Sequence, residues 1–342
     1  MPAEWEPHEA TWIGWPHNAS DWPGKLAAIH FVYGEIVRKI AVGEIVRIIV
    51  NDEKHEAKAR SVLNHVGVDP QAVEFFRIPT DRGWTRDFGP IFVRDGNETA
   101  IAGFQFNAWA KYSDYKLDEK VAEKLAKKIK RKYLPVLHNG KPFVLEGGAI
   151  DVNGRGTLIT TEECLLDDEV QVRNPGVSGE EIETVLADSL GATNVLWLER
   201  GIAGDDTHGH VDDLCRFVNE KTVVLCRENN SRDANYNLLE ENRERLQGFR
   251  LENGSKIQTE FLPMPTPLYF RGQRLPASYA NFLITNAAVL VPTFNDPNDR
   301  VALGVLSEFF PDRQVIGIHA VDLVLGLGTL HCLSQQQPAE LI

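Results

Sequence analysis

The sequence predicts an α/β fold made of five similar units that follow one another along the chain. In each unit a helix is followed by a short apolar strand and then by a polar turn that contains glycine. The residues that mark the five turns are 59, 64, 71 and 51 positions apart, namely Asp87, Glu146, His210, Asn281 and Cys332. Such a period is typical of radial or stacked repeats. Because no Pro/Ser/Gly-rich linker divides the chain, we expect one domain spanning residues 1–342.

The chain opens with a segment rich in tryptophan and proline, residues 5–23. Within it, Thr11–Trp15 is expected to be a strand that ends at Pro16, because proline cannot donate to a strand ladder. The clustered tryptophans form either core or the rigid wall of a pocket. Residues 25–41 are expected to be helical and 45–50 to be a strand. The apolar positions that share one side of this helix are Leu26, Ile29, Ile36 and Ile40.

Capping signals place two further helices. A helix over 54–66 is expected to end before Gly67, since glycine adopts the left-handed conformation that follows many helices. A helix over 178–190 begins with a capping box formed by Ser178 and Glu181, and a glycine follows it.

Apolar spacing places the remaining elements. Expected helices cover 118–133, where apolar residues recur every four positions, and also 232–246 and 299–310. The basic residues of the first of these lie mostly off its apolar stripe and are interpreted as a solvated face. The strands expected after the helices cover residues 73–78, 195–198, 257–262 and 314–318.

Two arrangements of these units are compatible with the spacing. In the first, five polar turns converge on one axis, and the strand Thr11–Trp15 completes the last unit near Cys332. That would close a ring and remove the free sheet edges. In the second, helices merely alternate with strands in a two-layer α/β fold.

Composition restricts the function classes. The 342 residues are 43% hydrophobic and 25% charged, as in soluble globular proteins, and the net charge of −13 argues against a nucleic-acid partner and suits a cationic ligand. The sequence contains no run of about 18 apolar residues, so no membrane span is predicted. Met1–Glu6 has no signal-peptide character, and none of the four cysteines forms a C-x-x-C pair. We therefore expect a cytoplasmic protein; the sequence leaves the oligomeric state open, a homo-oligomer included.

The segment Gly326–Pro338 contains a candidate nucleophile, Cys332. Its glycines allow a strand end to approach a ligand closely. The cysteine belongs to no zinc ligand pattern, and histidines and acids occur elsewhere in the chain, as a covalent catalyst requires. The alternative is a buried, inert thiol.

The segment Asp205–Asp213 supports two different chemistries. Its T-H-x-H-x-D order, through His208, His210 and Asp212, is that of binuclear zinc hydrolases, although an aspartate stands where the next histidine should be. Without metal, His210 pairs with Cys332 as general acid and base. If the segment is extended, His210 and Asp212 face the same cavity, because residues two apart point to one side.

Two other turns bring carboxylates and an aromatic ring. Asp87 follows Trp84, which can lie over a delocalised cation, and Glu146 precedes two glycines. Acids clustered around a thiol repel one another unless the substrate brings positive charge. A guanidinium fits, because it is planar and binds carboxylates through parallel hydrogen bonds.

Together these motifs resemble the agmatine deiminase / bacterial peptidylarginine deiminase-like family of the guanidino-group-modifying (pentein) superfamily. The resemblance implies a five-bladed, pseudo-symmetric α/β propeller of ββαβ units that forms a single catalytic domain. The matching stretches are Ala3–Glu9, Trp15–Pro16, Trp84–Pro90, Glu146–Gly148, Asp205–Asp212, Tyr279–Phe282 and His331–Cys332 with Gln335–Gln336.

The resemblance also implies a set of roles. Cys332 is the nucleophile, His210 is the acid and base, and the guanidinium is held by Asp87, Asp212 and Glu146. The implied reaction is hydrolytic deimination through an amidino-cysteine intermediate, with agmatine giving N-carbamoylputrescine and ammonia, a step of putrescine biosynthesis. Neither a metal nor an organic cofactor is implied. The alternatives are a deiminase of peptidyl-arginine, a zinc-dependent hydrolase, and a binder of guanidino ligands without activity.

Some positions depart from the agmatine deiminase pattern. Leu327 replaces the middle glycine of three, Thr329 replaces asparagine, and His208 and Asp213 differ from the usual residues. Residues 17–24 are similar to the branch labelled peptidylarginine deiminase. The side chains of the implied chemistry are retained, so these changes bear on the part of the substrate beyond the guanidinium.

Overall fold

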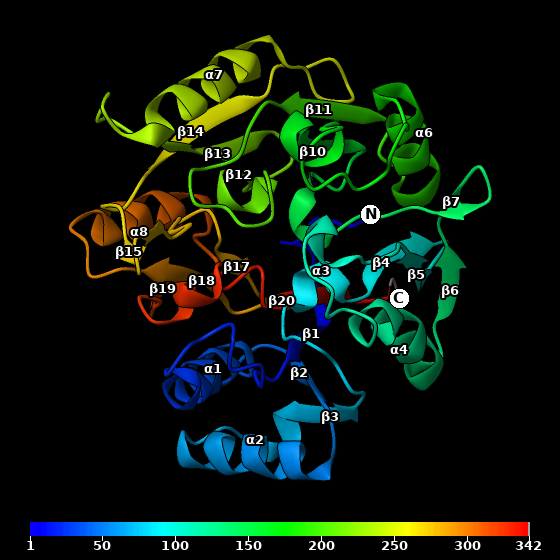
Figure 1. The fold of residues 1–342 in the computed structure, drawn as a ribbon, viewed down its shortest axis with the longest axis vertical. Coiled ribbons are helices and arrows are strands. Elements are labelled where there is room, and N and C mark those ends of the chain that lie inside the picture. The colour runs from blue at the N-terminus through cyan, green and yellow to red at the C-terminus, as the bar shows by residue number, and fades with distance from the viewer. Residues whose placement is uncertain (341–342) are drawn as a thin grey trace.

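The structure, a computed structural model, describes residues 1–340, in which helices alternate with small sheets. Five of the sheets have three or four strands, and each combines an antiparallel strand pair with a parallel one. In Figure 1 the helices α1, α4, α6, α7 and α8 lie toward the outside of the molecule, and the short α3 lies near its middle. The chain is therefore an α/β protein, as predicted.

The first sheet contains both ends of the described chain. β1 (His8–Gly14) pairs antiparallel with β20 (Ser334–Pro338), with Thr11 opposite Gln336. The other strands and helices of this unit are α1 (Leu26–Ile40), β2 (Ile45–Val50), α2 (Glu53–His65) and β3 (Val73–Arg77). The predicted pairing of the N-terminal strand with the end of the chain is thus confirmed.

The other four sheets share one plan. Their strands are β4 (Ile91–Asp95), β5 (Glu98–Gly103) and β6 (Lys132–Pro135); β9 (Asp151–Val152), β10 (Thr157–Thr161) and β11 (Asn194–Leu198); β12 (Cys215–Phe217), β13 (Thr222–Arg227) and β14 (Gln258–Pro263); β17 (Leu283–Ile284), β18 (Ala288–Thr293) and β19 (Gln314–His319). In each sheet the first two strands are antiparallel and the last two are parallel.

A helix connects each pair of parallel strands, because such strands cannot be joined by a tight turn. These helices are α4 (Val121–Ile129), α6 (Gly179–Leu190), α7 (Ala234–Gly248) and α8 (Asn298–Phe309). The remaining short elements are α3 (Thr85–Phe88), α5 (Glu162–Leu165), and two hairpins: β7 (Leu137–His138) with β8 (Lys141–Pro142), and β15 (Tyr269–Phe270) with β16 (Gln273–Arg274). Each unit thus contains an antiparallel strand pair that the helix–strand pattern of the sequence alone did not predict.

Two structural expectations are wrong. Within residues 1–340 no sheet closes on itself, so pairing of the chain ends does not remove the free sheet edges. The reason is that turns such as Gly147–Ala149, rather than continuous ladders, join one sheet to the next. The strands also do not form the single covered sheet of the two-layer alternative, because they divide into separate small sheets.

The predicted helix 118–133 is too long. Residues 118–120 form a 3₁₀ turn, and the following helix ends at Ile129, because Lys130 adopts a left-handed conformation with φ of 57°. Residues 132–135 then pair with β5 as a strand. By contrast, the capping box of Ser178 and Glu181 forms as predicted at the start of α6.

The core includes the tryptophans of the N-terminal segment. Trp12, Trp15 and Trp22 are all less than 2% exposed. Trp22 packs against Trp84 with ring centroids 5.2 Å apart, so this cluster joins the first sheet to the centre of the molecule. Among the described helices, none has the length and apolarity to cross a bilayer.

Candidate active site

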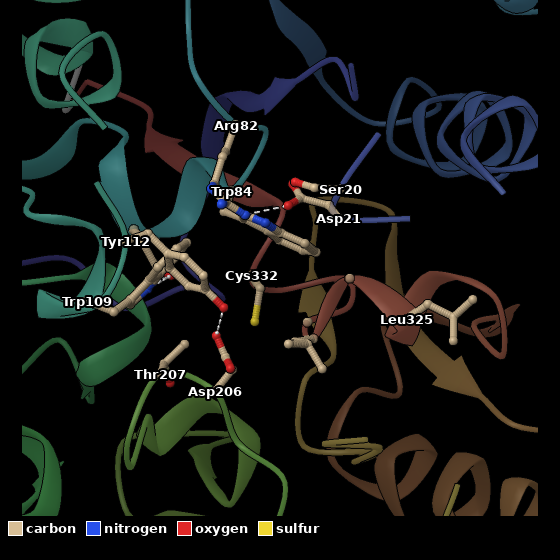
Figure 2. Close-up of a pocket in the computed structure, with 14 residues that line it drawn as sticks. Ser20, Asp21, Arg82, Trp84, Trp109, Tyr112, Asp206, Thr207, Leu325 and Cys332 are labelled. Atoms are coloured by element: carbon tan, nitrogen blue, oxygen red, sulfur yellow. Dashed lines mark hydrogen bonds and ion pairs between the residues drawn. The ribbon is translucent and has the colours of Figure 1, made fainter. Parts of the chain in front are cut away.

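A cavity of about 260 Å³ opens near the middle of the molecule, and Cys332 lies at its wall (Figure 2). The figure shows the Cys332 sulfur pointing into the space between side chains of several distant segments. The aromatic and acidic side chains of the lining are Trp84, Trp109, Tyr112, Asp21, Asp87 and Asp206. The predicted residues Cys332, Asp87 and Trp84 are therefore brought together here.

Cys332 is 5% exposed and is held by one amide and one acid. Nδ2 of Asn281 donates to Sγ at 3.0 Å, and Oδ2 of Asp212 lies 3.6 Å from Sγ. Burial raises the pKa of the thiol well above its usual value, and the charges of Asp212, Asp213 and Asp87 raise it further. The thiol form is thus favoured until a cation offsets these charges.

The His210 ring is fully buried between two carboxylates. Nδ1 lies 3.8 Å from Oδ1 of Asp87, and Nε2 lies 3.8 Å from Oε2 of Glu146. Neither ring nitrogen has a hydrogen-bond partner among the described residues. Burial opposes protonation, but the charge of Asp87 and contacts with Cys164 and Glu146 raise the pKa of His210 well above its usual value. The ring therefore carries a proton to donate.

Asp87 lies in α3 and accepts two hydrogen bonds. Gly148 N donates to Oδ1 at 3.1 Å, and Trp109 Nε1 donates to Oδ2 at 2.9 Å. Burial raises the pKa of Asp87 to about 6, although the His210 charge acts in the opposite direction. A Cβ on Gly148 would lie 2.5 Å from Nδ1 of His210 and 2.9 Å from Oδ1 of Asp87, so only glycine fits at this turn.

Glu146 is paired with an arginine that the sequence did not single out. Nε of Arg173 lies 3.1 Å from Oε1 of Glu146, and both side chains are fully buried. Burial opposes ionisation, but Arg173 outweighs it and lowers the pKa of Glu146 to about 2. Arg173 also donates to the carbonyl of Thr207, and so connects Glu146 to the segment that carries His210.

Asp212 lies behind Cys332 in a 3₁₀ turn, Val211–Asp213. The expectation of an extended segment is therefore wrong, although His210 and Asp212 are both buried beside the site. Oδ2 of Asp212 lies 2.7 Å from Nδ1 of His331, and Oδ1 is buried with no partner in the described chain. Burial raises the pKa of this carboxyl, but the hydrogen bond from His331 outweighs it and leaves the pKa lowered.

Asn281 holds the nucleophile from two sides. Besides donating to Sγ, it accepts at Oδ1 from Thr329 Oγ1 at 2.8 Å and from the backbone nitrogens of His331 and Cys332 at 3.1 and 3.3 Å. Its Nδ2 also lies 3.0 Å from Oδ1 of Asp213. Burial, together with the charge of Asp212, raises the pKa of Asp213 well above its usual value. In the sequence, Asn281 marks the polar turn of its unit, as Asp87, Glu146, His210 and Cys332 mark theirs, and this position indicates its role.

The ligand set expected for zinc does not come together. Nε2 of His208 lies 2.8 Å from Oδ2 of Asp167, and its backbone has a φ of 65°. The groups of described residues that could share a metal ion are Glu146 with Cys164 and His210, and Asp212 with Asp213 and Cys332. His208 belongs to neither, so the T-H-x-H-x-D segment does not form one site.

The outer part of the cavity carries charged side chains that pair with one another. Arg82 donates to Asp21 Oδ1 at 2.5 Å and to Asp114 at 3.0 Å, and Lys111 lies 2.6 Å from Asp206. Figure 2 shows Arg82, Asp21 and Asp206 around the space in front of Cys332. Leu327, one of the departures from the family pattern, lines this space and has a φ of 68°.

Cys332 and Asp87 line the cavity, whereas His210, Asp212 and Glu146 are buried next to them and outside its lining. A buried thiol with a protonated imidazole and carboxylates beside it defines a site of the cysteine-dependent, guanidinium-binding class. The chain belongs to the family of Porphyromonas-type peptidyl-arginine deiminases, whose model matches residues 1–338.

Curated relatives and solved structures agree with this assignment. The chain is 36% identical to an agmatine deiminase of Stutzerimonas stutzeri, over 100% of this chain and 96% of the relative. It is similar to a solved substrate-bound agmatine deiminase variant of C. jejuni, with a TM-score of 0.87, 33% identity, and coverage of 100% and 96%. Agmatine deiminase of Enterococcus faecalis gives a TM-score of 0.89 at 30% identity, with coverage of 99% and 95%.

Proposed function

We propose that this protein is an agmatine deiminase, which hydrolyses agmatine to N-carbamoylputrescine and ammonia through a covalent intermediate on Cys332. The observation that carries this proposal is the position of the sulfur, 3.6 Å from the Asp212 carboxylate and on the same cavity wall as Asp87. A planar cation placed between these acids is presented to the sulfur. The agmatine deiminases among its relatives, which it matches over nearly their whole length, support the same reaction.

In the first half of the reaction the guanidinium binds between Asp87 and Asp212, with Glu146 in support. Its charge offsets the acids that hold the Cys332 thiol protonated, so the thiol releases its proton to solvent and the thiolate forms. The thiolate attacks the guanidinium carbon. His210, which is already protonated, gives its proton to the departing nitrogen, and ammonia leaves. An amidino-thioether remains on Cys332.

In the second half the neutral imidazole of His210 removes a proton from water. The resulting hydroxide attacks the amidino carbon, the bond to sulfur breaks, and the ureido product leaves. Each acid contributes by fixing the orientation of the carbon in front of the sulfur. Trp84, on the cavity wall, provides an aromatic face for the delocalised cation.

The outer part of the cavity favours a substrate with a free amine over free arginine. The terminal nitrogens of Arg82 are already paired with Asp21 and Asp114, and Lys111 is paired with Asp206. A substrate carboxylate would have to break these pairs, whereas a substrate ammonium group would face the carboxylates of Asp21 and Asp206. An arginine within a peptide remains the second candidate, because the matching family model bears that description.

The finer account of the fold belongs to the same proposal. The five larger sheets are five blades of a pseudo-symmetric propeller of ββαβ units, and residues 1–342 form one catalytic domain. The recurring antiparallel–parallel strand plan and the pairing of β1 with β20 support this. The reaction needs a reduced Cys332, so we also propose a cytoplasmic location.

A panel of guanidino compounds tests the proposed function. Agmatine, free arginine, an arginine-containing peptide and a simple alkylguanidine are supplied to the purified protein, and ammonia and ureido product are measured. We expect agmatine to have the largest kcat/KM and a chelator to leave its rate unchanged. A preference for the peptide would support the second candidate, and binding without ammonia release would contradict deimination.

A further inference from the structure

His331 immediately precedes the nucleophile, and its ring lies between two buried carboxylates. Nδ1 is 2.7 Å from Oδ2 of Asp212, and Nε2 is 2.9 Å from Oε2 of Glu4. None of the three side chains is more than 4% exposed. Because an imidazole has one hydrogen-bonding position at each nitrogen, this ring connects the two acids directly.

Glu4 is itself held by two further groups. Its Oε2 pairs with Arg216, and Ile284 N donates to Oε1 at 2.6 Å. Burial opposes ionisation of Glu4, but Arg216 and then His331 outweigh it and leave the pKa lowered. The segment that precedes β1 therefore supplies a charged, immobile acceptor for the His331 ring.

Asp212 has two oxygens in different situations. Oδ2 is occupied by His331, whereas Oδ1 is buried and has no partner in the described chain. A buried oxygen without a partner is costly, so a hydrogen-bond donor from a ligand is favoured there. The orientation of the carboxylate decides which oxygen meets the ligand, and His331 fixes that orientation.

We propose that Glu4 and His331 are positioning residues that act through Asp212, keeping its carboxylate charged and turned so that Oδ1 receives the substrate guanidinium. This inference rests on the proposed function, since it names how the same site binds its substrate. Neither residue touches the reacting atoms. Glu4, His331 and Asp212 come from positions up to 327 residues apart in the chain.

A double-mutant cycle tests whether His331 acts through Asp212. Agmatine binding is measured by calorimetry in a Cys332→Ser background, so that no turnover occurs. We expect His331→Gln to weaken binding about 10- to 100-fold, the range for loss of a charge-assisted hydrogen bond. In an Asp212→Asn background the same change should cost less than about 3-fold, because coupled residues are not additive.

The pH dependence of kcat/KM gives a second readout. Asp87 sets the acidic limb near pH 6, and protonation of Asp212 makes the profile steeper at a lower pH. Loss of the His331 hydrogen bond raises the pKa of Asp212, so the pH at which the profile steepens moves upward. We expect a shift of about one to two pH units in His331→Gln and a smaller one in Glu4→Gln. Other charged or titratable groups that act on Asp212 and its neighbours are His210, Arg86, Arg216, Cys332, Asp213 and Asp87.

Glu44→Gln is the matched control. Glu44 is also buried and lies 3.1 Å from a histidine, His8. That histidine contacts the backbone carbonyl of Glu4 at 2.7 Å, not its carboxylate, and does not contact Asp212. Its variant should keep the acidic limb and the agmatine affinity of the parent protein. Thermal unfolding of each variant identifies those that fold. If His331→Gln does not fold, the test is made with Glu4→Gln.

Three results would overturn the inference: unchanged binding in a folded His331→Gln protein, equal shifts in Glu4→Gln and Glu44→Gln, or additive effects of His331→Gln and Asp212→Asn. Failure of the proposed function looks different. In that case the unaltered protein releases no ammonia from agmatine, whatever the variants do.

Discussion

The buried residues around Cys332, here called the inner wall (Asp87, Glu146, His210 and Asp212), and the outer part of the cavity are both rich in acids, but they differ in which atoms are left without partners. At the inner wall both ring nitrogens of His210 and Oδ1 of Asp212 are buried and unpartnered within residues 1–340. In the outer part, Arg82 and Lys111 pair with nearby carboxylates. The inner wall is therefore arranged for a ligand. In the outer part most charged groups pair with one another, and Oδ2 of Asp21 and Nε of Arg82 are the buried exceptions among the described lining residues.

This difference has an energetic consequence. Each buried polar group without a partner costs about 1–3 kcal/mol. A bound guanidinium, which has only donors, recovers this at Oδ1 of Asp212, whereas the ring nitrogens of protonated His210 need an acceptor. Two of the outer pairs include a partly exposed side chain, with 44% for Asp114 and 38% for Lys111, and such pairs contribute about 0–1 kcal/mol. The Arg82–Asp21 pair is more buried, at 11% and 3%. Substitutions at the inner wall should accordingly slow the chemical step. Substitutions in the outer part should have small effects on which substrate is preferred.

The largest expected effect is that of Cys332→Ser. Removing the thiol removes the only step that forms a covalent intermediate, so kcat should fall by about 10⁴-fold or more. Ammonia release from agmatine measures this, and circular dichroism should show an intact fold. Near wild-type turnover in the variant would contradict the covalent scheme.

The next largest effect is expected for Gly148→Ala. The new Cβ would come 2.5 Å from Nδ1 of His210, and so should displace either the ring or Asp87 and lower kcat about 100-fold. Gly304→Ala is its control, because no atom lies within 4 Å of a Cβ there. Equal activity of both variants would show that the close packing around His210 is not needed.

The pH profile should show an acidic limb near 6. Burial raises the pKa of Asp87 to about 6, so Asp87 is charged above this pH and can hold the guanidinium, and it is protonated below. We therefore expect kcat/KM for agmatine to fall about tenfold per pH unit as the pH drops below 6. A profile that stays flat down to pH 4 would exclude Asp87 from the clamp.

The smallest effect is expected for Asp21→Asn in the outer part. Asp21 lines the cavity and its Oδ2 has no partner in the described chain, so it can meet the amine of agmatine. KM for agmatine should rise about 3- to 10-fold, whereas that for an alkylguanidine without an amine should not change. Asp114→Asn is the comparison, because Asp114 pairs with the same arginine but does not line the cavity.

Local sequence signals were reliable where structure depends on neighbours in the chain. The capping box at Ser178 predicts the start of α6, and β2 has the predicted bounds of 45–50. They failed at Lys130, where periodicity alone extended the helix although the chain turns into a strand paired with β5. That pairing partner is about 30 residues away, so no local pattern contains it.

Residue types and their recurrence in the sequence determined which turns carry chemistry, and they named Cys332, His210, Asp87, Asp212, Glu146 and Trp84. Only the tertiary structure decided which atoms of those residues are occupied. Three residues from segments far apart in the chain make these contacts: Arg173 pairs with Glu146, His331 pairs with Asp212, and Glu4 pairs with His331. The physical reason is that hydrogen-bond satisfaction in a buried site depends on partners brought together in space, which spacing along a sequence does not encode.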